Sequence, residues 1–501
     1  MSRFGRVIIA ALALFAQVLL AELVEVHVLQ TSDIHAAISR EKEHGGSWLQ
    51  LAHLTQEFLD RYGRENSLLI DCGDTLQGTM LGALSRGAVG IIPLHTLKYD
   101  AWIPGNHDFD FGFARFLELA APLREIILCG NLQPLQEPPF ASWRCFNRNN
   151  ANIAVIGMTA SYLKHWLGET FGDSCRVSFA LDSIAAIMPE VLRQKPDCII
   201  LAIHQGWQEQ ADARQVNEVS AIVEKFPEID LVLGGHTHRP FPGHKIGSRT
   251  WYLQPGFGGR SLAVARISID TSKHKVLEIS SYLSSIQEDT PVHQPLQQHL
   301  QEWLEQEQQA KTTAIAPAPG QDILSKGRPG VNCAASELFC AALAEAAETT
   351  LALHGTLSSA NLKAGQPVTE HDLFNFVPYE NTIVTATVTA EQLAEIVLEQ
   401  WGQRDSYTFC GIWGAEVSIA ADGKSAQAIF PDDLPRHRLA LNSFTAAGSG
   451  RYPKLTAILK LPQVQTTDTG ISTRNAVRSY LQKHPGVSIT PKQWLKTAKK
   501  H

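Results

Sequence analysis

Short apolar runs of strand-like character recur through the first half of the chain, and a polar segment follows each of them. Four of the clearest runs cover residues 24–29, 68–70, 198–203 and 229–233. Runs of this length between turn residues are typical of buried strands in an α/β sheet. If these strands lie side by side, their ends meet at one sheet edge, where open α/β sheets build their sites. We therefore expect the polar segments to lie close together.

The five polar segments carry side chains that bind metal ions. They are Ser32-Asp33-Ile34-His35, Cys72-Gly73-Asp74, Gly105-Asn106-His107-Asp108, His204 and Gly234-Gly235-His236-Thr237-His238. A single histidine is more often a surface or core residue, but five such segments in order indicate a common centre. Carboxylate and imidazole suit Mn, Zn or Fe, and a carboxylate such as Asp74 can bridge two cations. Two ions about 3.5–4 Å apart can hold a phosphoryl oxygen and activate a water molecule.

A change of composition marks a boundary after the first half. Residues 291–311 are rich in Gln and Glu, with leucines and Trp303 at helical spacing, and a Pro-rich stretch extends to residue 320. We expect a connecting helix and loop over residues 289–320, although a peripheral helix of the first domain would give the same pattern. Beyond it, the pattern predicts a helix over 334–349, a strand over 382–388 and a helix through residue 400 that Thr389 caps.

Length and charge narrow the class of protein. A chain of 501 residues is too long for one ordinary core, so two domains are expected. The net charge of −7 does not favour a polymer of nucleic acid as a partner. Residues 1–21 combine two arginines with an apolar stretch and predict a cleaved signal peptide, and thus a periplasmic or secreted protein without a stable membrane anchor. An uncleaved anchor is the alternative.

Cysteine placement adds one hypothesis about disulfides. The chain has 8 cysteines and no Cys-x-x-Cys pair. Cys72 and Cys198 lie in strand-like runs and are expected to be inert core thiols. An exported protein can form disulfides, and Cys129 with Cys145 is the pair that we expect to be bridged.

The ordered segments resemble the calcineurin-like metallophosphoesterases, and the string Gly-Asn-His-Asp-Phe-Asp-Phe-Gly at 105–112 resembles their 5'-nucleotidase branch. The resemblance implies an α/β protein with a four-layer α/β/β/α metallophosphoesterase domain over residues 22–288 and a second α/β substrate-specificity domain over 321–495. It implies two divalent metal ions. Their ligands would be Asp33, His35, Asp74 and His238 for one ion, and Asp74, Asn106, His204 and His236 for the other. His107 would stabilise the transition state and Asp110 would orient it. Asp108 stands where this branch usually has Glu.

The second domain resembles the nucleotide-specificity domain of the 5'-nucleotidases with several departures. Phe409 and Phe444 match the two rings that sandwich the base there, although core packing would explain either phenylalanine equally well. The phosphate-binding Arg of the family corresponds to Ser359, and the ribose-binding Asp to Gly450. Either the substrate differs, or Arg451 and Lys363 take over these contacts.

These observations predict an exported dimetal hydrolase of nucleotides or related organic phosphates. A 2',3'-cyclic-nucleotide phosphodiesterase and a thiosulfohydrolase-like sulfur-ester hydrolase are alternatives that would use the same centre. A non-catalytic metal- or nucleotide-binding protein is a third, but a binder would not need the pair formed by His107 and Asp110.

Overall fold

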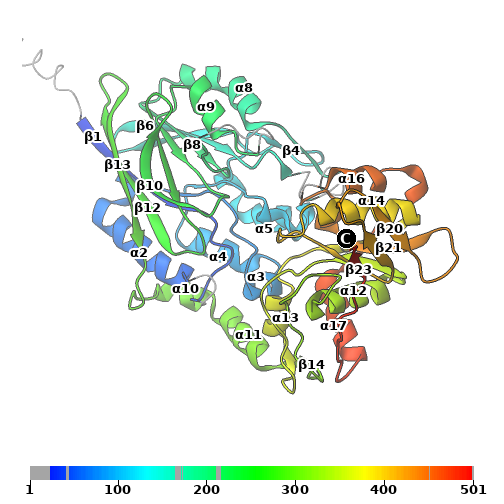
Figure 1. Cartoon of the computed structure of the whole chain (residues 1–501). Helices are drawn as coiled ribbons and strands as arrows, with labels where there is room; N and C mark the ends of the chain where they lie inside the picture. The colour runs from blue at the N-terminus through cyan, green and yellow to red at the C-terminus, as the bar shows by residue number, and fades with distance from the viewer. Residues whose placement is uncertain are drawn as a thin grey trace, which may run out of the picture. The chain divides into compact units, whose positions relative to one another are not determined.

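The structure is a computed structural model that describes residues 23–498 except 41–44, 164–166, 168–170, 172, 210–215 and 451. The chain forms two compact units (Figure 1). The first comprises the residues up to Gln77, Gly87–Tyr162 and Ser174–Leu300, and the second comprises Gly78–Arg86, Leu163–Asp173 and the chain from Gln301 onward. The first unit thus ends inside the segment that we expected to connect two domains.

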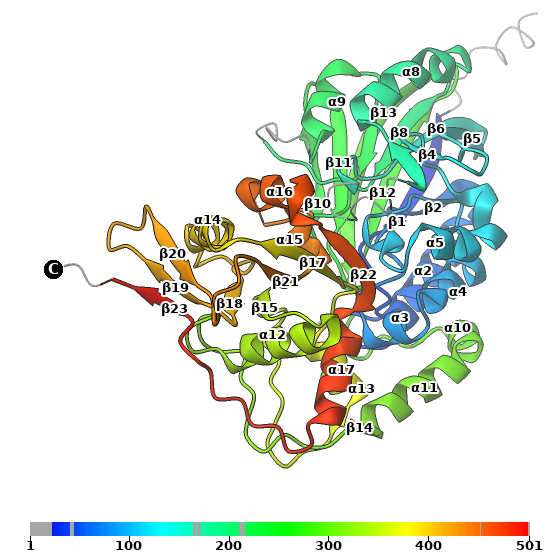
Figure 2. The same cartoon turned by 90° about the vertical axis from the view of Figure 1, so that its right-hand side faces the viewer.

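Two mixed sheets form the centre of the first unit (Figure 2). One sheet has the order β13-β12-β1-β2-β3 and the other has the order β10-β11-β9-β8-β6-β5. The strands of the first are β1 (Leu23–Thr31), β2 (Ser67–Asp71), β3 (Ala101–Trp102), β12 (Ser261–Asp270) and β13 (Lys275–Ser285). Those of the second are β5 (Trp143–Arg148), β6 (Ala151–Met158), β8 (Cys198–Ile203), β9 (Leu231–Leu233), β10 (Pro240–Ile246) and β11 (Thr250–Pro255). The short strands β4 (Leu132–Pro134) and β7 (Cys175–Val177) pair separately.

The sheets pack face to face because each presents one apolar face to the other. Val26 of β1 and Ile70 of β2 share a fully buried cluster with Val155 of β6 and Ile200 of β8. Helices α8 (Ala180–Arg193) and α9 (Val219–Lys225) cover the outer face of the second sheet, while α2 (Trp48–Tyr62), α4 (Ala88–Thr96) and α5 (Phe113–Ala120) lie along the first (Figure 2). The expected α/β/β/α layering is confirmed. Helix α10 (Gln294–His299) completes this unit.

A five-stranded sheet of order β18-β15-β21-β17-β22 forms the centre of the second unit. Its strands are β15 (Leu351–His354), β17 (Thr382–Val388), β18 (Gly411–Trp413), β21 (His437–Asn442) and β22 (Thr467–Ser472). Helix α12 (Ala334–Ala347) packs on one face against Ala352 and Ala440, whereas α14 (Ala390–Trp401) and α16 (Pro453–Leu459) pack on the other against Leu351 and Leu439. Small residues on one face and leucines on the other follow from the period of two along each strand.

The remaining elements of this unit are short. The helices are α3 (Met80–Leu84), α11 (Gln301–Thr312), α13 (Glu370–Phe376), α15 (Ser443–Ala446) and α17 (Thr473–Lys483), and the strands are β14 (Ala314–Ala316), β16 (Val368–Thr369), β19 (Glu416–Ile419), β20 (Ala426–Ile429) and β23 (Leu495–Thr497). The predicted strand over 382–388 is confirmed, as is the helix after Thr389, whose side chain forms a capping box with Gln392. The predicted connecting helix is instead two helices, α10 and α11, which are separated at Leu300.

Two further expectations concern export. The predicted signal peptide, residues 1–21, lies outside the described residues and stays a prediction. Among the described helices, none has the length and apolar character needed to cross a bilayer.

All eight cysteines are free thiols, so the bridge expected between Cys129 and Cys145 is wrong for this structure. Cys145 packs toward the helices over the second sheet, while the Cys129 thiol faces Asn131 at 3.9 Å.

Candidate metal centre

The predicted ligands lie at the carboxyl ends of parallel strands from both sheets of the first unit. Asp33 and His35 follow β1, Asp74 follows β2 and Asn106 follows β3. His204 follows β8, and His236 and His238 follow β9. Because β1, β2 and β3 run parallel to one another, as do β8 and β9, each sheet delivers its polar residues to one edge.

The ligand atoms form two overlapping groups. Those of Asp33, His35, Asp74 and His238 all lie within 4.8 Å of one another, as do those of Asp74, His204 and His236. Asn106 joins the second group through its Oδ1, which lies 2.9 Å from Nδ1 of His236. Asp74 is the residue common to both groups, which is the arrangement that a bridging carboxylate requires.

Backbone geometry at the strand ends aims these side chains inward. Asp33, His35, Asp74, His236 and His238 all adopt positive φ, between 53° and 70°, although none is glycine. Positive φ is uncommon for residues other than glycine, and residues held in it cluster at functional sites. The conformation is held by backbone hydrogen bonds, such as those from Asp33 N to Gly73 O at 2.7 Å and from His35 N to Asp74 O at 2.8 Å.

Glycine is required where two ligand loops touch. A Cβ on Gly105 would lie 2.3 Å from Oδ1 of Asp74, and one on Gly73 would lie 2.3 Å from the backbone N of Gly105. Gly73 also has φ of 89°. The Gly-Asp and Gly-Asn pairs of the sequence therefore let the second and third ligand loops come into contact.

Hydrogen bonds fix which imidazole nitrogen can bind a cation. Nδ1 of His35 donates to Gln77 O at 2.8 Å, and Nδ1 of His204 donates to Cys72 O at 2.6 Å. Their Nε2 atoms therefore face the centre, a pattern typical of metal-binding histidines. His204 Nε2 lies 3.1 Å from Oδ2 of Asp74, and His35 Nε2 lies 2.9 Å from Nε2 of His238. Two imidazole nitrogens that face each other, and a third that faces a buried carboxylate, are a donor set that divalent cations would satisfy.

Buried carboxylates and imidazoles at the centre shift one another's pKa values. Burial lowers the pKa of His35 and that of His236 to about 3, so both imidazoles are in the neutral form that binds metals. Burial opposes ionisation of Asp74, yet His204 and His107 hold the pKa of this carboxyl well below its usual range. Burial likewise opposes protonation of His204, but Asp74 raises the pKa of that imidazole to about 9. A bound cation would displace the proton of His204 and would take its place as the positive charge beside Asp74.

The pair formed by His107 and Asp110 lies beside the ligands. Nδ1 of His107 is 2.8 Å from Oδ2 of Asp110, and the His107 ring lies 5.4 Å from that of His35. Burial opposes protonation of His107, but Asp110 and Asp74 outweigh it and raise the pKa of the imidazole to about 10. His107 belongs to neither ligand group. It is a cation whose orientation is fixed by Asp110.

Asp108 has a structural role that the sequence did not indicate. Its buried carboxylate accepts hydrogen bonds from the backbone N–H groups of Gly105, Asp74, Thr75 and Leu76 at 2.7–3.1 Å. It thereby joins the loop after β2 to the loop after β3. The sequence marked Asp108 as a replacement of Glu, and nothing local to it signals contacts more than thirty residues away.

The two phenylalanines predicted to stack on a base have different environments in the second unit. Phe409 is 3% exposed and belongs to the core that packs against α14, so its ring offers no free face. Phe444 is half-buried on α15. Tyr407, two residues before Phe409, is 88% exposed, and the sequence analysis did not single it out.

The positions that depart from the family pattern are explained in part. A Cβ on Gly450 would lie 2.5 Å from the Tyr452 ring, which leaves no room for the aspartate of the family. Lys363 forms an ion pair with Asp322 at 3.1 Å. Arg451 lies outside the described residues, and Ser359 is exposed in a loop.

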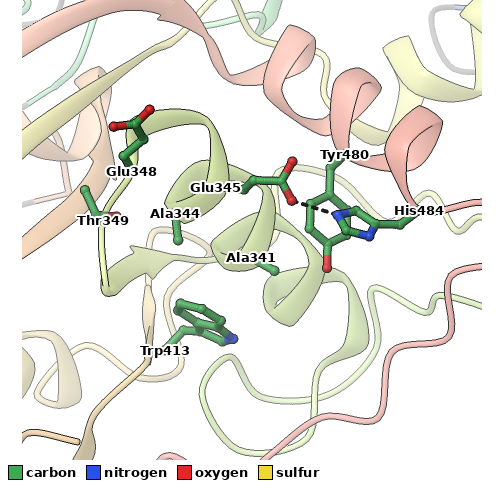
Figure 3. A pocket seen from close by; sticks show the side chains of 8 residues that line it. All are labelled: Ala341, Ala344, Glu345, Glu348, Thr349, Trp413, Tyr480 and His484. Carbon is green, nitrogen blue, oxygen red and sulfur yellow. Dashed lines mark hydrogen bonds and ion pairs between the residues drawn. The ribbon is translucent and has the colours of Figure 1, made fainter. Parts of the chain in front are cut away.

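A separate pocket of about 410 Å³ lies within the second unit (Figure 3). Trp413 and Tyr480 line it, together with small residues of α12. Its carboxylate Glu345 is paired with His484 at 2.7 Å and with Lys483 at 3.0 Å. None of the predicted site residues lines this pocket.

Comparison with known proteins agrees with this geometry. The chain matches the calcineurin-like phosphoesterase model over residues 26–240 and the 5'-nucleotidase C-terminal domain model over residues 309–457. The chain resembles the 5'-nucleotidases over both of these domains. This resemblance was expected from the sequence and is confirmed, and the two ligand groups fit the dinuclear metal centre of the calcineurin-like phosphoesterases.

Individual relatives are distant. Protein UshA of Yersinia enterocolitica is 23% identical over 474 residues, which is 83% of each chain. Protein 5NUC of Lutzomyia longipalpis is 26% identical over 234 residues, and the match spans 43% of this chain and 39% of that protein. The crystal structure of a 5'-nucleotidase precursor from Thermus thermophilus has a TM-score of 0.68 at 19% identity, covering 95% of this chain and all of the other. At this identity the structural likeness establishes the fold alone.

Proposed function

We propose that the protein hydrolyses phosphoesters of nucleotides, or of closely related organic phosphates, at a centre of two divalent cations. The observation that carries the proposal is the position of Asp74 in both ligand groups. Asp33, His35 and His238 would complete one metal position, and Asn106, His204 and His236 would complete the other. Mn, Zn and Fe all suit this mixture of carboxylate, amide and imidazole.

The chemistry follows from the charges of the site. When bound, two cations would supply an activated water nucleophile and would stabilise the phosphoryl oxygens. The new bond from the water oxygen to phosphorus forms as the bond to the leaving oxygen breaks, so no covalent phosphoenzyme is required. His107, protonated and held by Asp110, is placed to donate to the oxygens that gain charge in the transition state.

A nucleotide is the favoured substrate because the second unit matches the family's C-terminal domain. The polar contacts of that domain differ here, since Ser359 and Gly450 replace an Arg and an Asp of the family pattern. Loss of a bidentate cation weakens phosphate binding, so affinity would come mainly from the metals and from a partly buried ring such as Phe444.

A substrate panel tests the proposal. Protein reconstituted with Mn²⁺, Zn²⁺ or Fe²⁺ would be assayed with 5'-mononucleotides, 2',3'-cyclic nucleotides, nucleotide sugars, aryl phosphates and thiosulfate esters. We expect phosphate release to be fastest from a 5'-nucleotide. Preferred turnover of a cyclic nucleotide or of a sulfur ester would support the corresponding alternative. If the protein bound two metals but hydrolysed none of these esters, it would be a non-catalytic binding protein.

A further inference from the structure

His238 differs from the other ligands of its group in exposure. Its side chain is 41% exposed, whereas those of Asp33 and Asp74 are almost completely buried. Like the other three ligands of its group it has a positive φ, of 57°, a conformation that only a few per cent of residues other than glycine adopt. An exposed ligand on a strained backbone needs support from outside the ligand set, because free rotation of the ring would weaken metal binding.

That support is a stack of three side chains. The ring of Phe257 lies parallel to that of His238, with centroids 4.9 Å apart and an angle of 14° between the planes. On Phe257 lies the guanidinium of Arg260, 4.1 Å from the ring centroid. A planar cation over an aromatic face is attracted by the ring quadrupole. Phe257 thus contacts both the exposed Arg260 and the ligand His238.

The loop that carries the stack is fixed by its backbone. Gly256, Gly258 and Gly259 have φ of 91°, 66° and 69°, so the segment Gly-Phe-Gly-Gly-Arg folds tightly around Phe257. Gly258 N donates to Asp33 O at 2.7 Å, which ties the loop to another ligand of the same group. Arg260 O accepts from Ile286 N at 3.0 Å, immediately after β13. The position of Phe257 is therefore set independently of His238.

We propose that Phe257 and Arg260 are positioning residues that hold the His238 imidazole in its ligand orientation, and so set the affinity of one of the two metal positions. The proposal rests on the dimetal centre proposed above and assigns it two residues beyond the ligands and their hydrogen-bond partners. Outer residues that orient a metal-binding histidine typically change affinity by 10- to 100-fold.

Metal titration of the apoprotein tests this without measuring turnover. Zn²⁺ would be titrated against a chromophoric chelator, and Co²⁺ would report ligand geometry by its visible absorption. We expect Phe257→Ala to weaken one of two sites by about 10- to 100-fold and to leave the other unchanged. Phe257→Tyr keeps a stacking ring and should bind like the wild type. Arg260→Met keeps the stem but loses the charge, and should show a smaller loss at the same site.

Phe257→Leu separates stacking from packing, because leucine fills much of the space but has no flat face. Weak binding in Phe257→Leu together with normal binding in Phe257→Tyr would support the proposal. Unchanged affinity in Phe257→Ala, equal loss at both sites, or a wild type that binds fewer than two ions would overturn it. The proposed function fails separately, if the wild type binds two ions and hydrolyses no ester.

Discussion

At the scale of the residue, the metal ligands and His107 are expected to have separate roles, and this difference is the main testable feature of the centre. His107 lies next to Asn106 in sequence, yet its nitrogen is held by Asp110 at 2.8 Å and it belongs to neither ligand group. His107→Ala should therefore leave two metal ions bound and lower turnover by about 10²–10³, the usual cost of one transition-state donor. Metal analysis and steady-state kinetics on the same preparation measure both effects.

Asp110→Asn is the matched control for that prediction. It keeps a polar group next to His107 but removes the charge, so the defect in turnover should be smaller than that of His107→Ala. Loss of one metal equivalent in His107→Ala would show that His107 is a ligand after all.

Residue types at the centre were predictable, while their surroundings were not. Asp33, His35 and Asp74 could be singled out because metal-binding side chains directly followed apolar runs, a pattern that is local in sequence. The role of Asp108 depends on contacts with a loop more than thirty residues away. The support of His238 by Phe257 likewise depends on a turn that brings a later loop to β9.

At the scale of the element, Phe409 in the segment before β18 and Phe444 on α15 lie in different environments. Because Phe409 is 3% exposed in the core, Phe409→Ala should lower the free energy of unfolding by about 3–5 kcal/mol. Phe444→Ala should instead weaken nucleotide binding by about 1–3 kcal/mol, seen as a higher KM, with little change for a small aryl phosphate. Denaturant unfolding and kinetics with both substrates distinguish the two. Equal losses on both substrates for Phe444→Ala would assign that ring to the core as well.

The start of α15 depends on a buried histidine that must stay neutral. Nδ1 of His354 donates to Gly355 O at 2.7 Å, so Nε2 accepts from Asn442 Nδ2 at 3.2 Å. Asn442 Oδ1 accepts from Thr445 N at 2.7 Å and caps the helix, which fixes the orientation of the amide. A proton on Nε2 would face the amide donor of Asn442 and break this network.

This network predicts a loss of stability in acid. Burial lowers the pKa of His354 from 6.5 to about 4, so the unfolded chain binds a proton between these values and the folded chain does not. The contribution is complete above pH 6.5 and is lost as the pH falls toward 4, by about 2 kcal/mol between pH 7.5 and 5. His354→Gln cannot titrate and should lack this component. Denaturant unfolding of both full chains at the two pH values measures it, and identical pH dependence would contradict it.

Element boundaries could be predicted where local signals exist. Thr389 caps α14 as the sequence suggested, and β17 has the expected bounds. The interruption between α10 and α11 at Leu300 could not be predicted, since the helical spacing of apolar residues continues through it. Burial of Phe409 could not be predicted either, because it depends on packing against α14.

At the scale of the whole molecule, the centre draws its ligands from two separate sheets. Asp33 and Asp74 follow strands of one sheet, and His204 and His238 follow strands of the other. Cations bound here would link the sheets at their edge and would bind the folded chain in preference to the unfolded one. Each site would then stabilise the fold by about 2.7 kcal/mol at a free metal concentration of 100 times Kd.

Metal removal should therefore lower thermal stability, and the size of this change should depend on Asp74. We expect a chelator to lower the Tm of the wild type and added metal to restore it. Asp74→Asn removes the carboxylate shared by both groups, so it should lose metal and activity together, by at least the 10- to 100-fold typical of outer-residue changes, and its Tm should no longer respond to the chelator. Asp110→Asn lies outside both groups and should keep the wild-type response. A variant Asp74→Asn that retains two metals and full activity would remove the bridging assignment, because no other described carboxylate belongs to both ligand groups.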